Sequence, residues 1–309
     1  MSTPEEQKSF WISVIIITVF STLGTLFTVI YIFIKFRREI PRRLVLNLGL
    51  ADFGLSIICL SLCSNNYYHK NLPPEDDALC KFQPIITWYF MKVSILWLVI
   101  ISFHSLLLIV YRKSFTKMQE IGITLSCWII PLVTSLLPIG NTGESYGHRN
   151  GVWCSFKEKG AQLANISSYY FPSLVVIIFC YLRIIYEIYI LKTYDEATRK
   201  KKLNKIGKLF AFVVCYFIVW SPLEFMYIYE FVNNRYVPFW VEYWDNILHM
   251  QGVFYFIIYG VMFGLFANVF YKTRYTIYRL QGKSIENPEQ EQEMTSVPNS
   301  ASSYSDSNI

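Results

Sequence analysis

The sequence predicts an all-α membrane protein, a bundle of seven transmembrane helices with a short amphipathic helix after it. Hydrophobic residues fill 53% of the 309 positions and charged residues 16%, against roughly 25% charged residues in an average soluble domain. The charged residues also gather in short stretches between long apolar runs. Lipid must therefore be the solvent for most of the chain.

Seven apolar runs are each long enough to span the hydrocarbon core, which takes about 20 residues of helix. The first run contains no charged residue, and the second contains only Asp52. Later runs carry isolated polar residues, such as Lys92 in the third. The predicted spans are residues 10–34, 44–68, 81–111, 121–139, 167–191, 206–231 and 244–271.

These spans divide the chain into four predicted parts. Residues 1–9 form a short extracellular N-terminus, and residues 10–270 form the bundle. Residues 271–283 form a basic amphipathic helix on the membrane surface, and residues 284–309 a disordered cytoplasmic tail, whose polar composition cannot bury a core. The run from Phe10 is too long for the apolar part of a signal peptide, so we expect it to remain as the first span.

The basic residues predict the orientation in the membrane. Nineteen Lys and Arg residues flank one side of the predicted spans, and seven flank the other. Positive charge favours the cytoplasmic side. We therefore expect a multi-pass plasma-membrane protein with its N-terminus outside and its C-terminus in the cytoplasm. Because these charges lie beside membrane spans, the net charge of +6 indicates membrane lipid, and not nucleic acid, as a partner.

Residue patterns that would indicate an enzyme or a metal site are scarce. The sequence has no His-Glu-x-x-His, no glycine-rich phosphate loop and no Cys-x-x-Cys, and its four histidines are scattered. We therefore expect no enzymatic activity, no cofactor and no metal. Two of the seven cysteines, Cys80 and Cys154, lie at a helix mouth or in a loop. They can form a disulfide if both are extracellular.

Two ionisable residues are predicted to lie deep in the bundle. An ionised carboxylate is costly in a bilayer, so Asp52 should face the interior and either lock helix packing or act as a switch. Lys92 lies about 18 Å along the third helix from Cys80, too deep to reach the surface easily. It either pairs with a carboxylate, such as Glu224 or Asp52, or meets an anionic group of a ligand.

The middle of the sixth span contains Trp220-Ser-Pro222. A proline there removes an intrahelical hydrogen bond and kinks the helix. The kink is either a pivot for movement or a passive bend. A basic stretch before this span sets topology, binds anionic lipid or contacts a cytoplasmic partner. It consists of Arg199, Lys200, Lys201 and Lys202.

Several short motifs follow one another along the bundle. They are Leu50-Ala-Asp52, Cys80-Lys-Phe-Gln83, Ser94-Ile-Leu-Trp97, Trp128, Trp153-Cys154, Tyr170-Phe-Pro172, Gln251-Gly252 and Tyr259-Gly260. This ordered set, over residues 10–280, resembles the cyclic-AMP-receptor-like branch of the seven-helix G-protein-coupled receptors. That branch is itself distantly similar to the secretin and adhesion receptors.

The resemblance implies a Cys80–Cys154 disulfide that ties the third helix to the second outer loop. It also implies that ligand binding moves the inner end of the sixth helix and opens a cleft for a heterotrimeric G protein. The third helix ends without an acidic-Arg-Tyr triplet, and the seventh lacks Asn-Pro-x-x-Tyr. From both absences we expect a receptor outside the rhodopsin type. The expected structural or switch residues are Asp52, Trp97, Trp220 and Pro222.

The function we expect is that of a G-protein-coupled receptor for a small molecule or a short peptide. Fewer than ten residues precede the first span, so the ligand should bind in the outer half of the bundle, under residues 141–165. A membrane transporter or channel is the alternative, although inverted repeats are not evident. A retinal pump needs a lysine in the last span, and residues 244–271 contain none. The candidate ligand-binding residues are Trp88, Lys92, Glu224, Tyr227, Asp245, His249 and Gln251.

The tail carries hydroxyl residues next to the acidic run 286–293. We expect phosphorylation there after activation, with the added charge recruiting an arrestin-like protein or a kinase; a purely solubilising tail is the alternative. The expected sites are Thr295, Ser296, Ser300, Ser302, Ser303, Ser305 and Ser307.

Overall fold

The computed structural model describes residues 3–36, 40–136, 146–149, 151–189 and 196–262. The chain divides into two compact units, residues 1–256 and 257–309. Of the second unit, only residues 257–262, the end of one helix, are described. The predicted helix at 271–283, the tail at 284–309 and its expected phosphorylation sites therefore lie outside the described residues.

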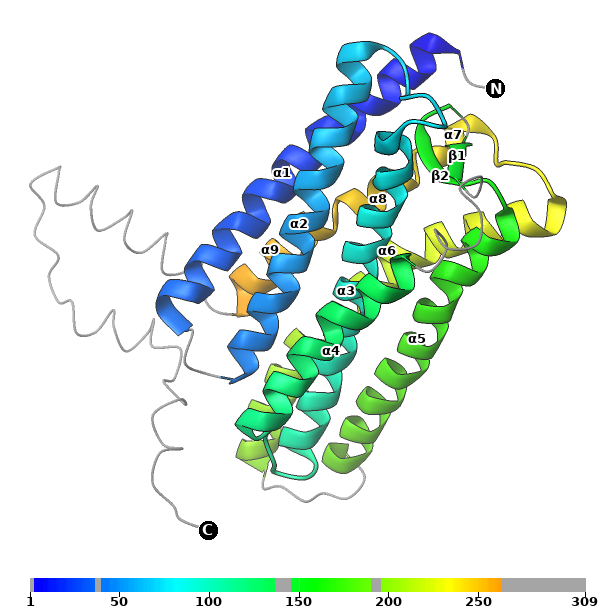
Figure 1. The fold of residues 1–309 in the computed structure, drawn as a ribbon. Coiled ribbons are helices and arrows are strands. Elements are labelled where there is room, and N and C mark those ends of the chain that lie inside the picture. The colour runs from blue at the N-terminus through cyan, green and yellow to red at the C-terminus, as the bar shows by residue number, and fades with distance from the viewer. Residues whose placement is uncertain (1–2, 37–39, 137–145, 150, 190–195, 263–309) are drawn as a thin grey trace, which may run out of the picture. The chain divides into compact units, whose positions relative to one another are not determined.

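In the described residues six long helices appear in the predicted order; two short strands lie between α4 and α5, and three shorter helices follow α6 (Figure 1). Helices α1 to α5 are each long and apolar enough to cross a membrane by length and composition. The long helices are α1 (Pro4–Phe36), α2 (Ile40–His69), α3 (Ala78–Ile109), α4 (Lys117–Leu136), α5 (Lys159–Tyr189) and α6 (Glu196–Asn233). The shorter elements are β1 (Tyr146–Arg149), β2 (Trp153–Phe156), α7 (Phe239–Glu242), α8 (Asp245–His249) and α9 (Gln251–Met262).

Helix α1 begins inside the segment predicted as a separate N-terminus, because the sequence there caps a helix. The Thr3 hydroxyl accepts a hydrogen bond from the Glu6 backbone N–H (3.3 Å), and the Glu6 carboxylate accepts one from the Thr3 N–H (2.7 Å). This reciprocal pair is a capping box, and Pro4 fits the first helical position. The hydropathy of residues 1–9 gave no sign of this start.

Helices α5 and α6 also begin before their predicted spans, at Lys159 and Glu196. Hydropathy marks only the part of a helix that needs lipid, whereas the backbone hydrogen bonds continue into polar sequence. The predicted seventh span is divided between α8 and α9 at Met250. The Met250 N–H still reaches the carbonyls of Asn246 and Ile247, so this division is a local distortion.

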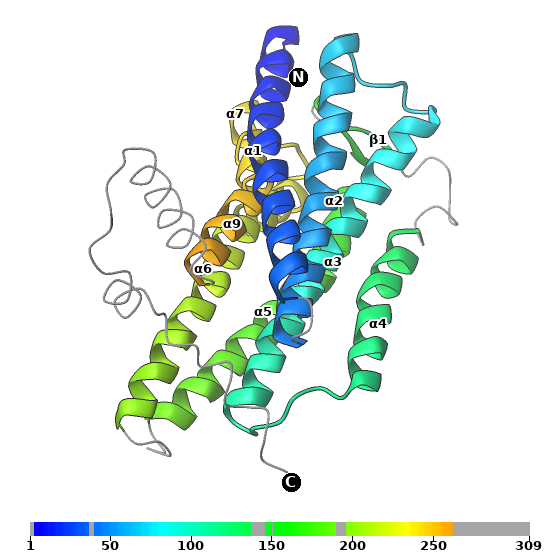
Figure 2. The same cartoon turned by 90° about the vertical axis from the view of Figure 1, so that its left-hand side faces the viewer.

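Within residues 1–256, α3 is the helix with the most neighbours: α2, α4 and α5 all pack against it (Figures 1 and 2). Helix α1 packs along α2, and α5 along α6. Large apolar side chains such as Phe20, Ile129 and Phe179 are exposed on α1, α4 and α5. Such surfaces suit a lipid solvent and would be unusual in water.

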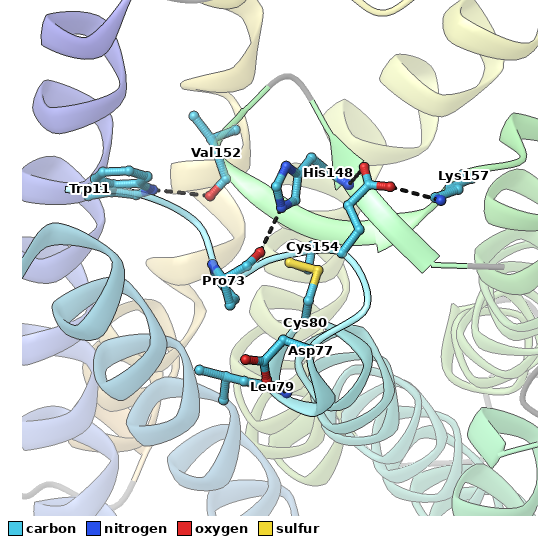
Figure 3. The surroundings of a disulfide bond; sticks show 10 residues. Trp11, Pro73, Asp77, Leu79, Cys80, His148, Val152, Cys154 and Lys157 are labelled. Atoms are coloured by element: carbon cyan, nitrogen blue, oxygen red, sulfur yellow. Dashed lines mark hydrogen bonds and ion pairs between the residues drawn. A yellow bond between two sulfur atoms is a disulfide. The ribbon is translucent and has the colours of Figure 1, made fainter. Parts of the chain in front are cut away.

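A two-stranded antiparallel hairpin, β1–β2, lies at the end of the bundle where α1 begins, which we call the hairpin end (Figure 1). The predicted disulfide is confirmed: Cys154 of β2 bonds Cys80 of α3, with an S–S distance of 2.06 Å (Figure 3). The Trp11 indole donates to the Val152 carbonyl (3.1 Å), so α1 also holds the hairpin.

The loop between α2 and α3 holds the opposite strand. The Glu75 carboxylate accepts from the His148 N–H (3.0 Å) and pairs with the Lys157 ammonium (2.8 Å) (Figure 3). The Lys157 side chain, and next the His148 N–H, lower the pKa of Glu75. The His148 ring also bonds the Pro73 carbonyl (2.7 Å). The hairpin is therefore held by α1, α3 and this loop together.

Replacing Cys80 or Cys154 by serine should destabilise the folded chain by about 4 kcal/mol in the loop-entropy account of disulfides, because the bond closes a separation of 74 residues. Surface expression, measured by flow cytometry with an N-terminal tag, should fall for both variants. The double variant should be no worse than either single one. Cys127→Ala, at a free buried thiol, is the control. Wild-type expression of Cys80→Ser would refute a stabilising bond.

Candidate functional site

Three helices meet at the carboxylate of Asp52, which is 1% exposed. Asp52 Oδ1 accepts hydrogen bonds from Ser94 Oγ of α3 (2.7 Å) and Gln251 Nε2 of α9 (2.6 Å). Gln251 Nε2 also donates to Ser94 Oγ (2.6 Å). Both donors belong to the motifs found in the sequence. The arrangement fits the predicted lock or switch, and Asp52 is not among the residues that line the cavity described below.

Pro222, where a kink of α6 is expected, lies inside the helix beside an aromatic cluster. Trp220 is fully buried, and its ring lies 6.2 Å from that of Tyr216. Tyr216 in turn stacks on Tyr170 of α5 at 5.7 Å. Ser221, next to Pro222, exchanges a hydrogen bond with the Tyr170 hydroxyl (2.7 Å). A change in the α6 bend must therefore repack α5. Trp97 of α3 is fully buried as well.

A cavity of about 50 Å³ lies between α3, α6, α8 and the hairpin. Four predicted ligand-binding residues line it: Trp88, Tyr227, Asp245 and His249. Pockets that enclose a drug-sized ligand measure roughly 300–1,000 Å³, so the cavity in this form accepts one small group or a few waters. The other lining residues are Cys59, Gln83, Pro84, Thr87, Met91, Arg149, Trp153, Cys154, Ser155 and Leu248.

The cavity wall offers polar atoms without a partner in the described part of the chain. The Gln83 side chain is 2% exposed, and neither its amide nitrogen nor its oxygen forms a hydrogen bond. His249 Nε2 lies 3.7 Å from Asp245 Oδ2, an ion-pair contact that is longer than a hydrogen bond. Buried polar groups cost free energy when left unpaired. A group that both donates and accepts would satisfy them.

A buried ion cluster joins the hairpin to α6 and α7. Arg149 of β1 is 2% exposed and contacts Glu230 Oε1 at 2.9 Å and Glu242 Oε2 at 3.5 Å. The two carboxylates raise the pKa of Arg149 against the opposing effect of burial. Its guanidinium lies over the Tyr227 ring, 4.9 Å from the centroid. The cluster therefore closes the cavity at the hairpin end.

Three predicted ligand-binding residues are not among those that line the cavity: Lys92, Glu224 and Gln251. Gln251 belongs to the Asp52 junction. Glu224 accepts a hydrogen bond from the Ser167 hydroxyl. Lys92 points to Thr134 and Tyr169 instead, and within the described residues no carboxylate lies within ion-pair distance of it. The ion pair with Glu224 or Asp52 was therefore a wrong prediction, since helical depth alone does not fix the direction of a side chain.

The basic stretch Arg199–Lys202 falls in the first part of α6, and its side chains lie outside the described part. At the same end of the bundle, Arg43 of α2 pairs with Glu120 of α4 (2.5 Å). The His104 ring bonds Ser114 Oγ (3.2 Å), which fixes the connection that follows α3.

Sequence reasoning missed Arg149, Glu242 and the site role of Gln83. The available signal is weak: a single arginine five residues before Cys154, and acidic residues near helix ends. A search for opposite charges in different loops could have identified this pairing. It also missed a Gly-x-Ser-x-Gly pattern at 143–147. A nucleophile elbow needs a strand before the serine and a helix after it. Here β1 begins inside the pattern, at Tyr146, and Ser145 lies outside the described residues.

Comparison with known proteins gives a family match over most of the chain. The family model described as "7 transmembrane receptor (rhodopsin family)" matches residues 24–255. The fold is similar to that of squid rhodopsin, with a TM-score of 0.68, 16% sequence identity and coverage of 95% of this chain and 91% of that one. The predicted seven-helix fold is confirmed.

Two curated relatives are similar in sequence. Chemokine XC receptor 1 of Homo sapiens is 26% identical over 207 residues, 64% of this chain and 58% of that protein. Allatostatin-A receptor of Bombyx mori is 22% identical over 222 residues, 65% of this chain and 60% of that protein. The chain thus matches less than two thirds of the length of either relative.

These matches correct the sequence-based branch assignment. The expectation of a receptor outside the rhodopsin type was wrong, and nothing in the comparisons supports the cyclic-AMP-receptor-like or secretin/adhesion branches. That expectation gave great weight to two short absent motifs. Both motifs are short, whereas the family match extends over residues 24–255.

Glu230→Gln should lower the stability of the folded chain by roughly 3 kcal/mol, because it leaves the buried Arg149 with less compensating charge. The apparent Tm of the purified protein in detergent measures this. Glu75→Gln is the matched control: its pair with Lys157 is over 40% exposed on both sides, so its loss should cost less than about 1 kcal/mol. Equal Tm shifts for the two variants would contradict the inferred importance of burial.

Proposed function

Because the chain belongs to the rhodopsin family of seven-transmembrane receptors, we propose that it is a G-protein-coupled receptor. The observation that carries this proposal is the cavity at the hairpin end, with the unpaired side-chain amide of Gln83 and the His249–Asp245 pair in its wall. Such a site suits recognition of an extracellular small molecule or short peptide. Relatives named as receptors for a chemokine and for allatostatin-A support a receptor function.

A ligand in the cavity would act on α6 through the α6 residue that lines the cavity, Tyr227. Tyr227 lies two turns along α6 from Trp220, and Trp220 lies beside Pro222. Binding that favours one arrangement of the Tyr170, Tyr216 and Trp220 cluster shifts the population of two bundle states. A tenfold shift takes about 1.4 kcal/mol, which one or two hydrogen bonds can supply.

The chain is a multi-pass membrane protein, and we assign its hairpin end to the extracellular side of the plasma membrane. A disulfide at that end suits an oxidising compartment. The excess of basic residues on the other side suits the cytoplasm. We therefore propose that the N-terminus lies outside the cell and the C-terminus inside. The transporter alternative gains no support from the cavity, because its lining residues lie at the hairpin end of the bundle and do not form a path through it.

Regulation through the tail is part of the same proposal. Phosphorylation between Thr295 and Ser307 would add charge next to the acidic run 286–293 and recruit a kinase or an arrestin-like partner. Truncation after Ser284 should then slow the decay of the response and preserve its initial size. Unchanged decay kinetics would favour a purely solubilising tail.

The receptor function predicts ligand-dependent nucleotide exchange on a G protein in membranes that contain the chain. Asp245→Asn and Trp88→Ala, which alter the cavity wall, should weaken the potency of an activating ligand at least about tenfold. Asp76→Asn, in the exposed loop before α3, is the control and should leave potency unchanged. Activation that is insensitive to both cavity variants would place the ligand site elsewhere. Absence of exchange with every G-protein class would contradict the function.

The basic beginning of α6 should contact the G protein. Replacing Arg199, Lys200, Lys201 and Lys202 by glutamine should slow nucleotide exchange about tenfold, since long-range steering depends on charge. Ligand affinity in membranes without G protein should not change. Epitope tags must first verify insertion, because the same charges favour the orientation. Correct insertion with wild-type exchange would assign the contact to another region, residues 111–117 first.

A further inference from the structure

Lys92 occupies an unusual position near the middle of α3. It lies 12 residues, about 18 Å at 1.5 Å per residue, from Cys80 at the hairpin end, and it is 2% exposed. Its ammonium does not line the cavity. It points toward α4 and α5, with Nζ 3.5 Å from Thr134 Oγ1 and 5.2 Å from the Tyr169 ring centroid.

The structure leaves this cation without an anion. The two carboxylates considered as its partners bind hydroxyl and amide groups instead: Asp52 Oδ1 accepts from Ser94 and Gln251, and Glu224 Oε1 accepts from Ser167. Their second oxygens have no hydrogen-bond partner in the described residues, and neither carboxylate forms an ion pair with Lys92 there. Within the described residues Lys92 forms no ion pair. Its ammonium contacts the Thr134 hydroxyl at 3.5 Å and the ring of Tyr169. An intramembrane ionisable residue is costly and commonly marks a functional site. A ring face alone compensates a buried ammonium poorly.

The side of α3 that Lys92 faces leads to the lipid-facing surface of the bundle. Thr134 and Tyr169 exchange a hydrogen bond (2.8 Å) that bridges α4 and α5, and both side chains are half-buried. On the same two helices, Ile130, Val133 and Val176 are exposed. A molecule arriving from the bilayer would therefore meet an apolar surface first and the Thr134, Tyr169 and Lys92 group behind it.

We propose that Lys92 binds the carboxylate of a long-chain fatty acid that enters from the membrane between α4 and α5. The carboxylate supplies the missing anion, and the Thr134 and Tyr169 hydroxyls can donate to its oxygens. The acyl chain lies along the exposed apolar side chains of α4 and α5. This site is separate from the cavity at the hairpin end, and the proposal does not depend on which ligand that cavity binds.

The depth of Lys92 selects this class of anion over a membrane phospholipid. Half of the hydrocarbon core is about 15 Å thick, so a group about 18 Å along α3 from its Cys80 end lies well below the phospholipid head groups. A phosphodiester remains charged and stays at the interface. A carboxylic acid crosses hydrocarbon in its neutral form. The ion pair forms when its proton passes to Lys92 in the uncharged amine form that burial favours, which leaves a carboxylate beside an ammonium.

The test measures binding directly on the purified full chain in nanodiscs of uncharged phospholipid. The probe is a photoreactive, alkyne-tagged analogue of oleic acid, and unlabelled oleic acid, methyl oleate, oleylamine and phosphatidic acid are competitors. Saturable labelling on α4 or α5 is expected, with competition by oleic acid alone. Lys92→Met should weaken binding at least tenfold, and Lys92→Arg should retain it. The matched control is Lys81→Met, which removes a lysine next to Cys80 at the hairpin end of α3. This variant should bind normally.

A second variant keeps the test decisive if Lys92→Met fails to fold. Thr134→Leu removes the hydroxyl next to Nζ and fills the approach to it, so it should also weaken binding at least tenfold. Equal competition by methyl oleate, or unchanged labelling in both variants, would overturn the proposal and leave Lys92 as a packing residue. Competition by phosphatidic acid in preference to oleic acid would assign the site to anionic phospholipid instead and overturn the fatty-acid assignment.

Discussion

The hydrogen bonds to Asp52 Oδ1 are the contact on which the arrangement of the bundle depends. They bring α2, α3 and α9 together at one buried oxygen, through Ser94 and Gln251. In hydrocarbon no water can replace a lost partner, so this junction fixes the register of three helices at once. Next to Gln251, an added Cβ on Gly252 would lie 2.9 Å from the Ser21 carbonyl of α1. Glycine there permits the close approach of a fourth helix.

The hairpin end is organised around a different constraint, the burial of Arg149. Its guanidinium needs both Glu230 and Glu242, so a strand, the end of α6 and α7 are held in one place. The disulfide fixes the other strand to α3. Between these two attachments lies the cavity with Gln83, Asp245 and His249 in its wall. Stability at this end and access to the cavity are therefore set by the same contacts.

Short sequence motifs predicted the fold and one covalent bond of this protein, but not its family. The ordered motifs led correctly to a seven-helix receptor and to the Cys80–Cys154 bond, and the polar residues among them meet at Asp52. The same reasoning failed on the branch, because it relied on the absence of two short motifs, whereas residues 24–255 as a whole match the rhodopsin family.

The sequence by itself determined the helices and their order, because the need to keep backbone polar groups out of lipid is met by local hydrogen bonds alone. Its local signals even contained the start of α1, in the capping residues Thr3 and Glu6. Only the tertiary structure decided the partners of the buried charges. Arg149 meets Glu230 from 81 residues away, whereas Lys92 meets no carboxylate within the described chain. Hydropathy gives the depth of a residue, but the rotation of each helix, fixed by packing against its neighbours, decides which side chains meet.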